Sequence, residues 1–180
     1  NIKMTNETKL SNALTKGGSS NKQITWTMQN FDFQKDDVVV IMWSMPNRWC
    51  VITDNTNIDN LPKYNKIGPW KIRKKIKHAK TRSDFYYKHI YNEFDSLVDT
   101  YTRIDYVSNM LNNLSIKNFH AMCRDDEFPD RKNQFKWQTT KFLKTTIDNS
   151  TIDIAPDDHP GYASHRLIAE KIHKEIEDRV

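Results

Sequence analysis

Cysteine is scarce in this sequence. The two cysteines, Cys50 and Cys123, are too few for a disulfide framework, and neither belongs to a Cys-x-x-Cys pair of the kind that holds structural zinc. Long hydrophobic runs are also lacking, because no apolar stretch approaches the roughly 20 residues that a membrane-spanning helix needs, and no signal peptide opens the chain. We therefore expect a soluble protein with no membrane span, no metal site and no cofactor, and its compartment stays open.

The chain nevertheless has enough apolar residues to fold. Of its 180 residues, 37% are hydrophobic and 11% are aromatic, and such residues are scarce in chains that form no core. This length fits one ordinary domain, so we expect a single domain over residues 1–180, with its oligomeric state open. The chain starts at Asn1 without an initiator methionine, so we also expect that the domain is truncated at its N-terminus.

The net charge of +5 is modest, and much of the excess lies in one stretch, WKIRKKIKHAK, at residues 70–80. A basic cluster of this kind can hold phosphates or an anionic glycan. The alternative is a solvated helix with one buried edge, which the four-residue spacing of Ile72 and Ile76 favours. Nucleic acid is therefore not the partner that we favour.

Two apolar runs predict strands. DDVVVIMWS, at residues 36–44, is a short β-branched run without alternation, which is typical of a parallel strand covered on both faces, and IKNFHAMC, at residues 116–123, is the second candidate. Between them, residues 83–114 predict one long amphipathic helix with a single apolar face. Its apolar residues recur at steps of three and four: Ile90, Phe94, Leu97, Tyr101, Ile104 and Leu111. A strand, a crossover helix and a second strand predict an α/β domain with a mostly parallel sheet and helices on both faces.

Other segments are less regular. Residues 10–14 carry a weak strand signal before a Gly17-Gly18 turn, and Ser19, Ser20 or Asn21 can cap a helix that follows. Residues 53–69 predict a long loop that forms a lid or a binding surface. Residues 163–177 predict a final helix that packs beside residues 38–42.

Three polar groups fall where strands of this sheet are expected to end: residues 18–21, 44–48 and 157–159. Ligands of open parallel sheets bind at the carboxyl ends of the strands, so we expect these groups to line one cleft. In the last group, His159 has the chemistry of a general base and Asp157 that of the acid that orients it. Found alone, the same pair is most often a loop histidine and an acid that caps a turn.

The other two groups offer donors and a cation. The Gly18 backbone and the Asn21 amide can donate to a developing oxyanion, although a plain turn before a capped helix is the alternative. Arg48 can clamp a carboxylate or phosphate, or it can pair with a structural acid. Ser44 and Asn47 complete the set of candidate substrate-binding residues at the end of the first strand.

The order of four segments resembles the SGNH hydrolase superfamily, also called GDSL esterases and lipases, and in particular its divergent viral and environmental members. KGGSSNKQI looks like the second block with its oxyanion glycine, DDVVVIMWSMPNR like the strand that leads to the third block, IKNFHAMC like the strand before the last block, and DDHPGYASHRLIAEKI like the last block itself. The usual Gly-x-Asn of the third block is absent, so Ser44 or Asn47 must substitute for it. The first block, with its nucleophilic serine, is also absent from this sequence.

The resemblance implies a flavodoxin-like, three-layer α/β fold and a serine-esterase-type hydrolase that acts on a small-molecule or glycan ester, such as an O-acyl group of a carbohydrate or lipid. It assigns His159 as the base, Asp157 as its acid, and Gly18 and Asn21 as oxyanion donors. Ser19 or Ser20 is a second interpretation for the nucleophile, which we disfavour because too little apolar sequence precedes them. The alternative function is a catalytically inactive binding or virion-associated module of the same fold.

Overall fold

The structure is a computed structural model, and it describes residues 20–56, 62–67, 77–124, 140–156 and 159–179. The elements follow in this order: α1 (Asn21–Gln29), β1 (Val38–Trp43), β2 (Trp49–Thr56), β3 (Pro62–Ile67), α2 (Lys77–His89), α3 (Glu93–Asn113), β4 (Lys117–Met122), the 3-10 turn η3 (Asp148–Ser150) and α4 (Tyr162–Glu177). Helices and a parallel strand pair in one chain confirm the mixed α/β class. None of the helices in the described ranges combines the length and the hydropathy that a membrane span needs.

β1 and β4 pair in parallel, as the sequence predicts. Their register runs from Val38 opposite Lys117 to Trp43 opposite Met122, and the Cys123 N–H donates to the Trp43 carbonyl at 2.9 Å just past the end of β4. A parallel bridge between His120 and Phe142 extends the pairing beyond β4. The carboxyl ends of β1 and β4 therefore lie together, which is the edge where the sequence predicts a site.

The prediction of a loop over residues 53–69 is wrong for residues 53–56 and 62–67, which are strands. β2 and β3 form an antiparallel pair, with Trp49 opposite Ile67 and Thr56 opposite Pro62, so this part of the chain adds a second sheet that is not parallel. Polar residues such as Lys63, Asn65 and Lys66 hide any hydrophobic alternation, whereas backbone pairing with a partner strand depends little on hydropathy. Residues 57–61 and 68–69 lie outside the described residues.

The single long helix predicted over residues 83–114 is two helices. The chain breaks after α2, where Ile90 and Tyr91 both donate their backbone N–H to the Tyr86 carbonyl, and α3 restarts with Asn92 as its N-cap, whose Oδ1 accepts from the Asp95 N–H at 3.0 Å. Ile90 therefore lies outside both helices and is 57% exposed. The predicted periodicity holds along α3 itself, whose buried positions include Leu97, Tyr101, Ile104 and Leu111.

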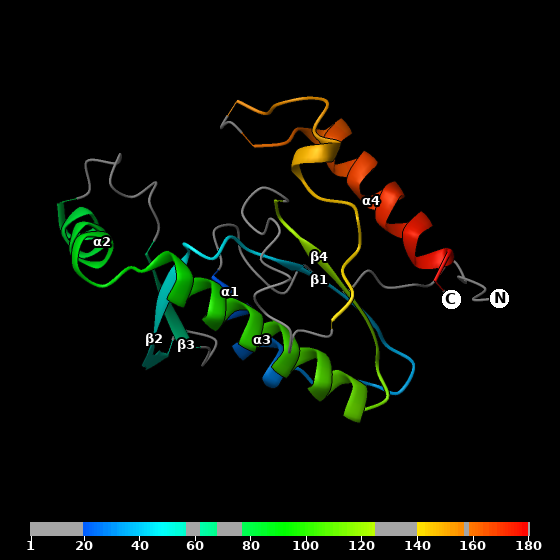
Figure 1. Ribbon diagram of the computed structural model, residues 1–180, viewed down its shortest axis with the longest axis horizontal. Coiled ribbons are helices and arrows are strands. Elements are labelled where there is room, and N and C mark those ends of the chain that lie inside the picture. Colours follow the sequence, from blue (N-terminus) through cyan, green and yellow to red (C-terminus); the bar gives the residue numbers. More distant parts are fainter. Residues whose placement is uncertain (1–19, 57–61, 68–76, 125–139, 157–158, 180) are drawn as a thin grey trace.

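The hydrophobic core lies between α3 and β1. Ile41 and Trp43 of β1 are buried against the apolar face of α3, and α1 contributes Ile24 and Met28 to the same cluster. Figure 1 shows α1 alongside α3, and the two helices are in contact. The amino-terminal half of β1 differs from the prediction of a strand covered on both faces, because Val38 and Val40 are exposed.

The final helix begins at Tyr162, one residue before the predicted start, and ends at Glu177 as predicted. We expected this helix to pack beside residues 38–42. Its anchoring hydrogen bonds instead reach η3 and the segment between β4 and η3. Glu175 accepts from the Lys144 N–H at 2.6 Å and from the Thr145 hydroxyl, and the Lys171 ammonium donates to the Ser150 hydroxyl at 3.1 Å. Figure 1 shows α4 on the other side of β4 from α3.

Candidate functional site

Ser20 is the N-cap of α1, which confirms that a residue of the predicted set caps this helix. Its hydroxyl accepts from the Gln23 N–H at 3.2 Å, and its carbonyl accepts from the Ile24 N–H at 3.0 Å. The same hydroxyl donates to the Cys50 Sγ atom of β2 at 2.9 Å, and Ser20 is 1% exposed. A hydroxyl that is buried and engaged on both sides is poorly placed to attack a substrate.

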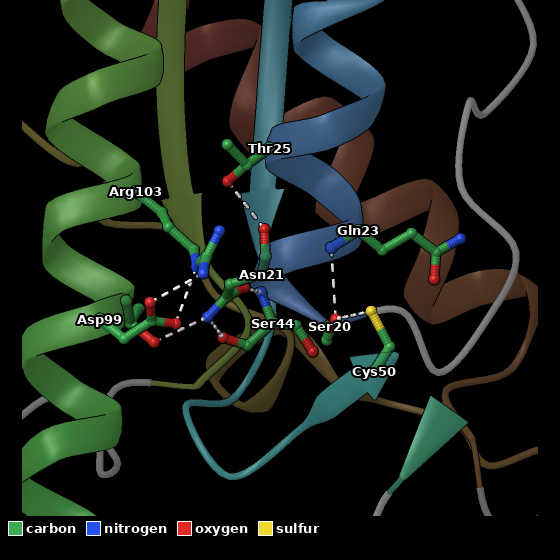
Figure 2. Close-up of polar contacts among 9 residues, drawn as sticks. Ser20, Asn21, Gln23, Thr25, Ser44, Cys50, Asp99 and Arg103 are labelled. Carbon is green, nitrogen blue, oxygen red and sulfur yellow. Dashed lines mark hydrogen bonds and ion pairs between the residues drawn. The ribbon is translucent and has the colours of Figure 1, made fainter. Parts of the chain in front are cut away.

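Asn21, the first residue of α1, binds the backbone of Ser44 at both ends of its amide. Nδ2 donates to the Ser44 carbonyl at 2.9 Å, and Oδ1 accepts from the Ser44 N–H at 2.8 Å. Nδ2 also donates to the Thr100 hydroxyl of α3 at 3.1 Å. Figure 2 shows Asn21 between Ser44 and α3, with Ser20 and Cys50 beside it. One buried side chain therefore joins α1, the end of β1 and α3.

These hydrogen bonds of Asn21 to Ser44 and Thr100, which we call the Asn21 lock, bring two of the three predicted polar groups together. Ser44 follows β1 directly, so the amino end of α1 lies at the carboxyl end of the parallel strands. Successive residues of a strand direct their backbone N–H and carbonyl groups to opposite sides. The Trp43 carbonyl bonds to the Cys123 N–H just past β4, so the N–H and carbonyl of the next residue, Ser44, face the other side, where they bond to Asn21. Gly18, the other predicted donor of the first group, lies outside the described residues.

The Asn21 side chain is not available as the oxyanion donor that the sequence predicts. An amide NH₂ has two hydrogens, and Ser44 and Thr100 receive both. Within the described residues, the backbone N–H groups of Asn21 and Lys22 are candidate donors at this point, because the first turn of a helix has no intrahelical acceptor for them. The helix dipole adds partial positive charge at the same place, which suits an anion.

Arg48 and Asn47 lie on the turn after β1. The Arg48 guanidinium donates from Nη1 to the Ser44 hydroxyl at 3.2 Å, and the Arg48 N–H closes the turn on the Met45 carbonyl at 3.1 Å. The Tyr87 hydroxyl donates to the Asn47 carbonyl, and burial raises the pKa of Tyr87. The structure therefore places Arg48 on the Ser44 side chain, on the turn beside the amino end of α1 that also carries Asn47.

An aromatic cluster borders this turn. The Trp49 ring stacks on Tyr86 with centroids 4.9 Å apart and planes 10° from parallel, and the Lys22 ammonium lies 5.6 Å from the centre of the Trp49 ring. Tyr87 and Tyr91 pack edge-on and tilted against Tyr86. The Trp49 ring, with Tyr86 stacked on it and the Lys22 ammonium near it, therefore borders the turn after β1.

His159 lies on the segment that leads into α4. It is exposed, and its carbonyl accepts from the Ala155 N–H at 2.8 Å. Asp157, its predicted acid, and Asp158 lie outside the described residues. His165 is exposed on α4 itself. Hydrogen bonds thus join Asn21, Ser44 and Arg48, Asn47 lies on the same turn, and His159 lies beside the Ile154–Pro160 bridge that precedes α4.

Two residues of this region escaped the sequence analysis. Thr100 completes the Asn21 lock, and its signal is a polar residue on the apolar face of the helix, between Leu97 and Tyr101. Asp153 caps α4, and a signal for it is its place before a proline-rich turn that ends in Gly161 and a helix. Within the described ranges, no group of three or more histidine, cysteine or acidic side chains is arranged to hold a metal ion.

The basic stretch at residues 70–80 is described only in part. Residues 70–76 lie outside the described residues, and residues 77–80 form the first turn of α2.

Comparison of the chain with models of protein families, with curated proteins and with solved structures finds no match in any of the three.

Proposed function

We propose that this chain supplies the oxyanion-binding and proton-transfer parts of a serine-esterase-type hydrolase that acts on an O-acyl group of a carbohydrate or lipid. The observation that supports the proposal most directly is the Asn21–Ser44 lock, which holds a helix amino end and Arg48 at the carboxyl end of β1. Preorganised donors at such a position stabilise the negative charge of a tetrahedral intermediate.

The residues take distinct roles. The backbone N–H groups of Asn21 and Lys22 replace the Asn21 side chain as oxyanion donors, and Arg48 binds a carboxylate or phosphate of the substrate. His159 takes the proton of the attacking hydroxyl and returns it to the leaving group, while Asp157 orients the imidazole. The nucleophile is the one member of the set that we assign to no residue of this sequence.

The test uses hydrolysis of p-nitrophenyl acetate by the purified chain, because a general base can activate water to attack this reactive ester without a nucleophilic side chain. We expect His159→Ala to lower kcat/KM by roughly 10²–10⁴-fold, because this is the usual contribution of a general base. His173→Ala is the matched control, since His173 is an exposed histidine of α4 whose Nδ1 contacts Glu177 at 3.4 Å. Equal turnover by wild type and His159→Ala would remove His159 from the mechanism.

A binding module without turnover is the second candidate, and the burial of the Ser20 hydroxyl favours it. An NMR titration with butyrate and with methylphosphonate separates the two. Turnover together with shifts of the Asn21 and Lys22 amides supports the hydrolase. The same shifts without turnover support the binding module, and the absence of shifts contradicts both.

A further inference from the structure

The described residues on the two sides of positions 157–158 pair with each other as a short antiparallel hairpin, which carries His159. Ile154 and Pro160 form an antiparallel bridge, flanked on one side by the Gly161 N–H bonded to the Asp153 carbonyl at 2.9 Å and on the other by the Ala155 N–H bonded to the His159 carbonyl at 2.8 Å. In this pattern Ile154 and Pro160 are a non-hydrogen-bonded pair of the antiparallel ladder. Proline has no backbone N–H, but at this position the ladder requires none, so no hydrogen bond is lost. The hairpin therefore determines the backbone position of His159.

Asp153 fastens this hairpin to the amino end of α4. Its Oδ1 accepts from the Ser164 N–H at 2.7 Å, and its Oδ2 accepts from the Ala163 N–H at 3.1 Å. The Ser164 hydroxyl also bonds to the carboxylate and accepts from the backbone N–H groups of Ile152 and Asp153, both at 2.9 Å. Ser164 is fully buried. The backbone carbonyl of Asp153 thus bonds to Gly161 of the hairpin, and its carboxylate bonds to the first turn of α4.

Gly161 provides the space for this contact. A Cβ atom at this position would lie 2.3 Å from the Asp153 Oδ2 atom, closer than real Cβ contacts allow. The Gly161 backbone has φ −79°, which other residues adopt easily, so its requirement is for space and not for an unusual conformation. The glycine of the hairpin and the acid opposite it form one unit.

We propose that Asp153 is a positioning residue for His159, and the catalytic part of this inference rests on the proposed function. Side chains of alternate residues in a strand share a face, so His159 and Gly161 lie on one face of the hairpin, and Asp153 lies opposite Gly161 on that face. The carboxylate of Asp153 already accepts from α4 at both oxygens, so it acts on His159 through the backbone and not by binding the imidazole. Asp157 keeps the role of the orienting acid.

The experiment compares Asp153→Ala with Asp153→Asn, which retains one acceptor oxygen, and with the control Glu170→Ala. Glu170 is an exposed acid of α4 that pairs with Arg166 at 2.8 Å, away from the hairpin. We expect hydrogen exchange at the Ala155 and Gly161 amides to rise at least about 10-fold in Asp153→Ala, with a smaller rise in Asp153→Asn and none in Glu170→Ala. The amides of β1 and β4 should keep their protection, which shows that the fold survives.

Kinetics on the same variants give the second readout. We expect kcat for p-nitrophenyl acetate to fall about 10- to 100-fold in Asp153→Ala with KM nearly unchanged, because a displaced base slows proton transfer without weakening binding. Unchanged exchange at Ala155 and Gly161 overturns the proposal. The proposal is also overturned if Asp153→Ala raises exchange in the hairpin but leaves kcat unchanged, while His159→Ala lowers kcat.

If the wild-type protein hydrolyses no ester, the proposed function fails. The positioning role of Asp153 is then tested only by how rigid the His159 backbone is in each variant. A heteronuclear NOE at His159 that drops in Asp153→Ala but not in Glu170→Ala supports it, and an unchanged NOE overturns it. Ser164→Ala, which removes the buried hydroxyl and keeps the Asp153 carboxylate, provides a second variant if Asp153→Ala does not fold. The same loss of NOE at His159 is expected, to a lesser degree.

Discussion

The amide of Asn21 binds the backbone of Ser44 as a neighbouring strand would, accepting from its N–H at 2.8 Å and donating to its carbonyl at 2.9 Å (Figure 2). Ser44 is the first residue after β1, and Asn21 is the first residue of α1. A side chain therefore takes over the pairing at the point where the strand ends. The position of the helix relative to the sheet, and with it the geometry of the candidate site, depends on this contact.

Replacing Asn21 with alanine should destabilise the protein strongly. The substitution removes three buried hydrogen bonds and leaves the Ser44 N–H and carbonyl unpaired, so we expect a loss of about 3 kcal/mol in the free energy of unfolding. Urea denaturation measures it. Asn30→Ala is the control, because the Asn30 side chain is exposed and bonds to the Trp26 carbonyl at 2.8 Å, and it should cost about 0.5 kcal/mol or less. Similar midpoints for both variants would contradict the role of the lock.

Ser20→Ala separates a capping hydroxyl from a nucleophile. Loss of the N-cap bond to the Gln23 N–H and of the contact with Cys50 should lower the free energy of unfolding by about 1 kcal/mol. Because the hydroxyl is buried, we expect kcat/KM of any measured ester hydrolysis to stay within about threefold of wild type. Complete loss of turnover in a folded Ser20→Ala protein would instead make Ser20 the nucleophile. Thermal unfolding and the ester assay are run on the same samples.

The buried imidazole of His120 should make stability depend on pH. Burial lowers the pKa of His120 from 6.5 to about 4. Its Nδ1 accepts from the Trp43 indole N–H at 2.9 Å, so the proton is on Nε2, which donates to Asn118 Oδ1 at 2.8 Å. Trp43, Asn118 and Phe142, which contact the ring, carry no charge. The neutral ring is thus the form that the folded protein accommodates.

The sign follows from these pKa values. Because the folded pKa lies below the unfolded one, the unfolded chain binds a proton first, so stability is complete above pH 6.5 and falls as the pH drops towards 4. At about 1.4 kcal/mol per pKa unit, the loss is roughly 3 kcal/mol. Urea unfolding at a series of pH values measures it, and His120→Gln should flatten the slope between pH 6.5 and 4. His173→Gln, an exposed control, should retain the wild-type slope.

Two isoleucines on the predicted helix face should respond very differently to alanine. Ile104 is fully buried in the core of α3, so Ile104→Ala should cost about 2–5 kcal/mol. Ile90 lies in the break between α2 and α3 and is 57% exposed, so Ile90→Ala should change the free energy of unfolding by less than about 1 kcal/mol. Guanidinium titrations of both variants check this. Equal losses would mean that α2 and α3 form the continuous helix that the sequence pattern predicts.

Local patterns in the sequence predicted the elements that depend on neighbours in the chain. The β-branched run of β1, the apolar spacing from Leu97 to Leu111 and the capping residue Ser20 appear as expected, because strand propensity, one buried helix face and an N-cap each involve residues close in sequence. The break at Ile90–Asn92 was not predicted, since a continued helical spacing does not show where the backbone turns away from the core.

The tertiary structure alone decided which polar residues meet. Asn21 lies 23 positions from Ser44 and 79 positions from Thr100, and no local pattern shows that its amide uses both donor hydrogens on these two residues. The pairing of β2 with β3 and the Asp153 cap of α4 depend likewise on contacts between segments. By itself, the sequence determined the mixed α/β class, the parallel strand pair and the polar residues near its carboxyl edge. The fold decided that the Asn21 side chain holds this edge together and leaves backbone amides as donors, because hydrogen-bond capacity is assigned only when distant groups pack.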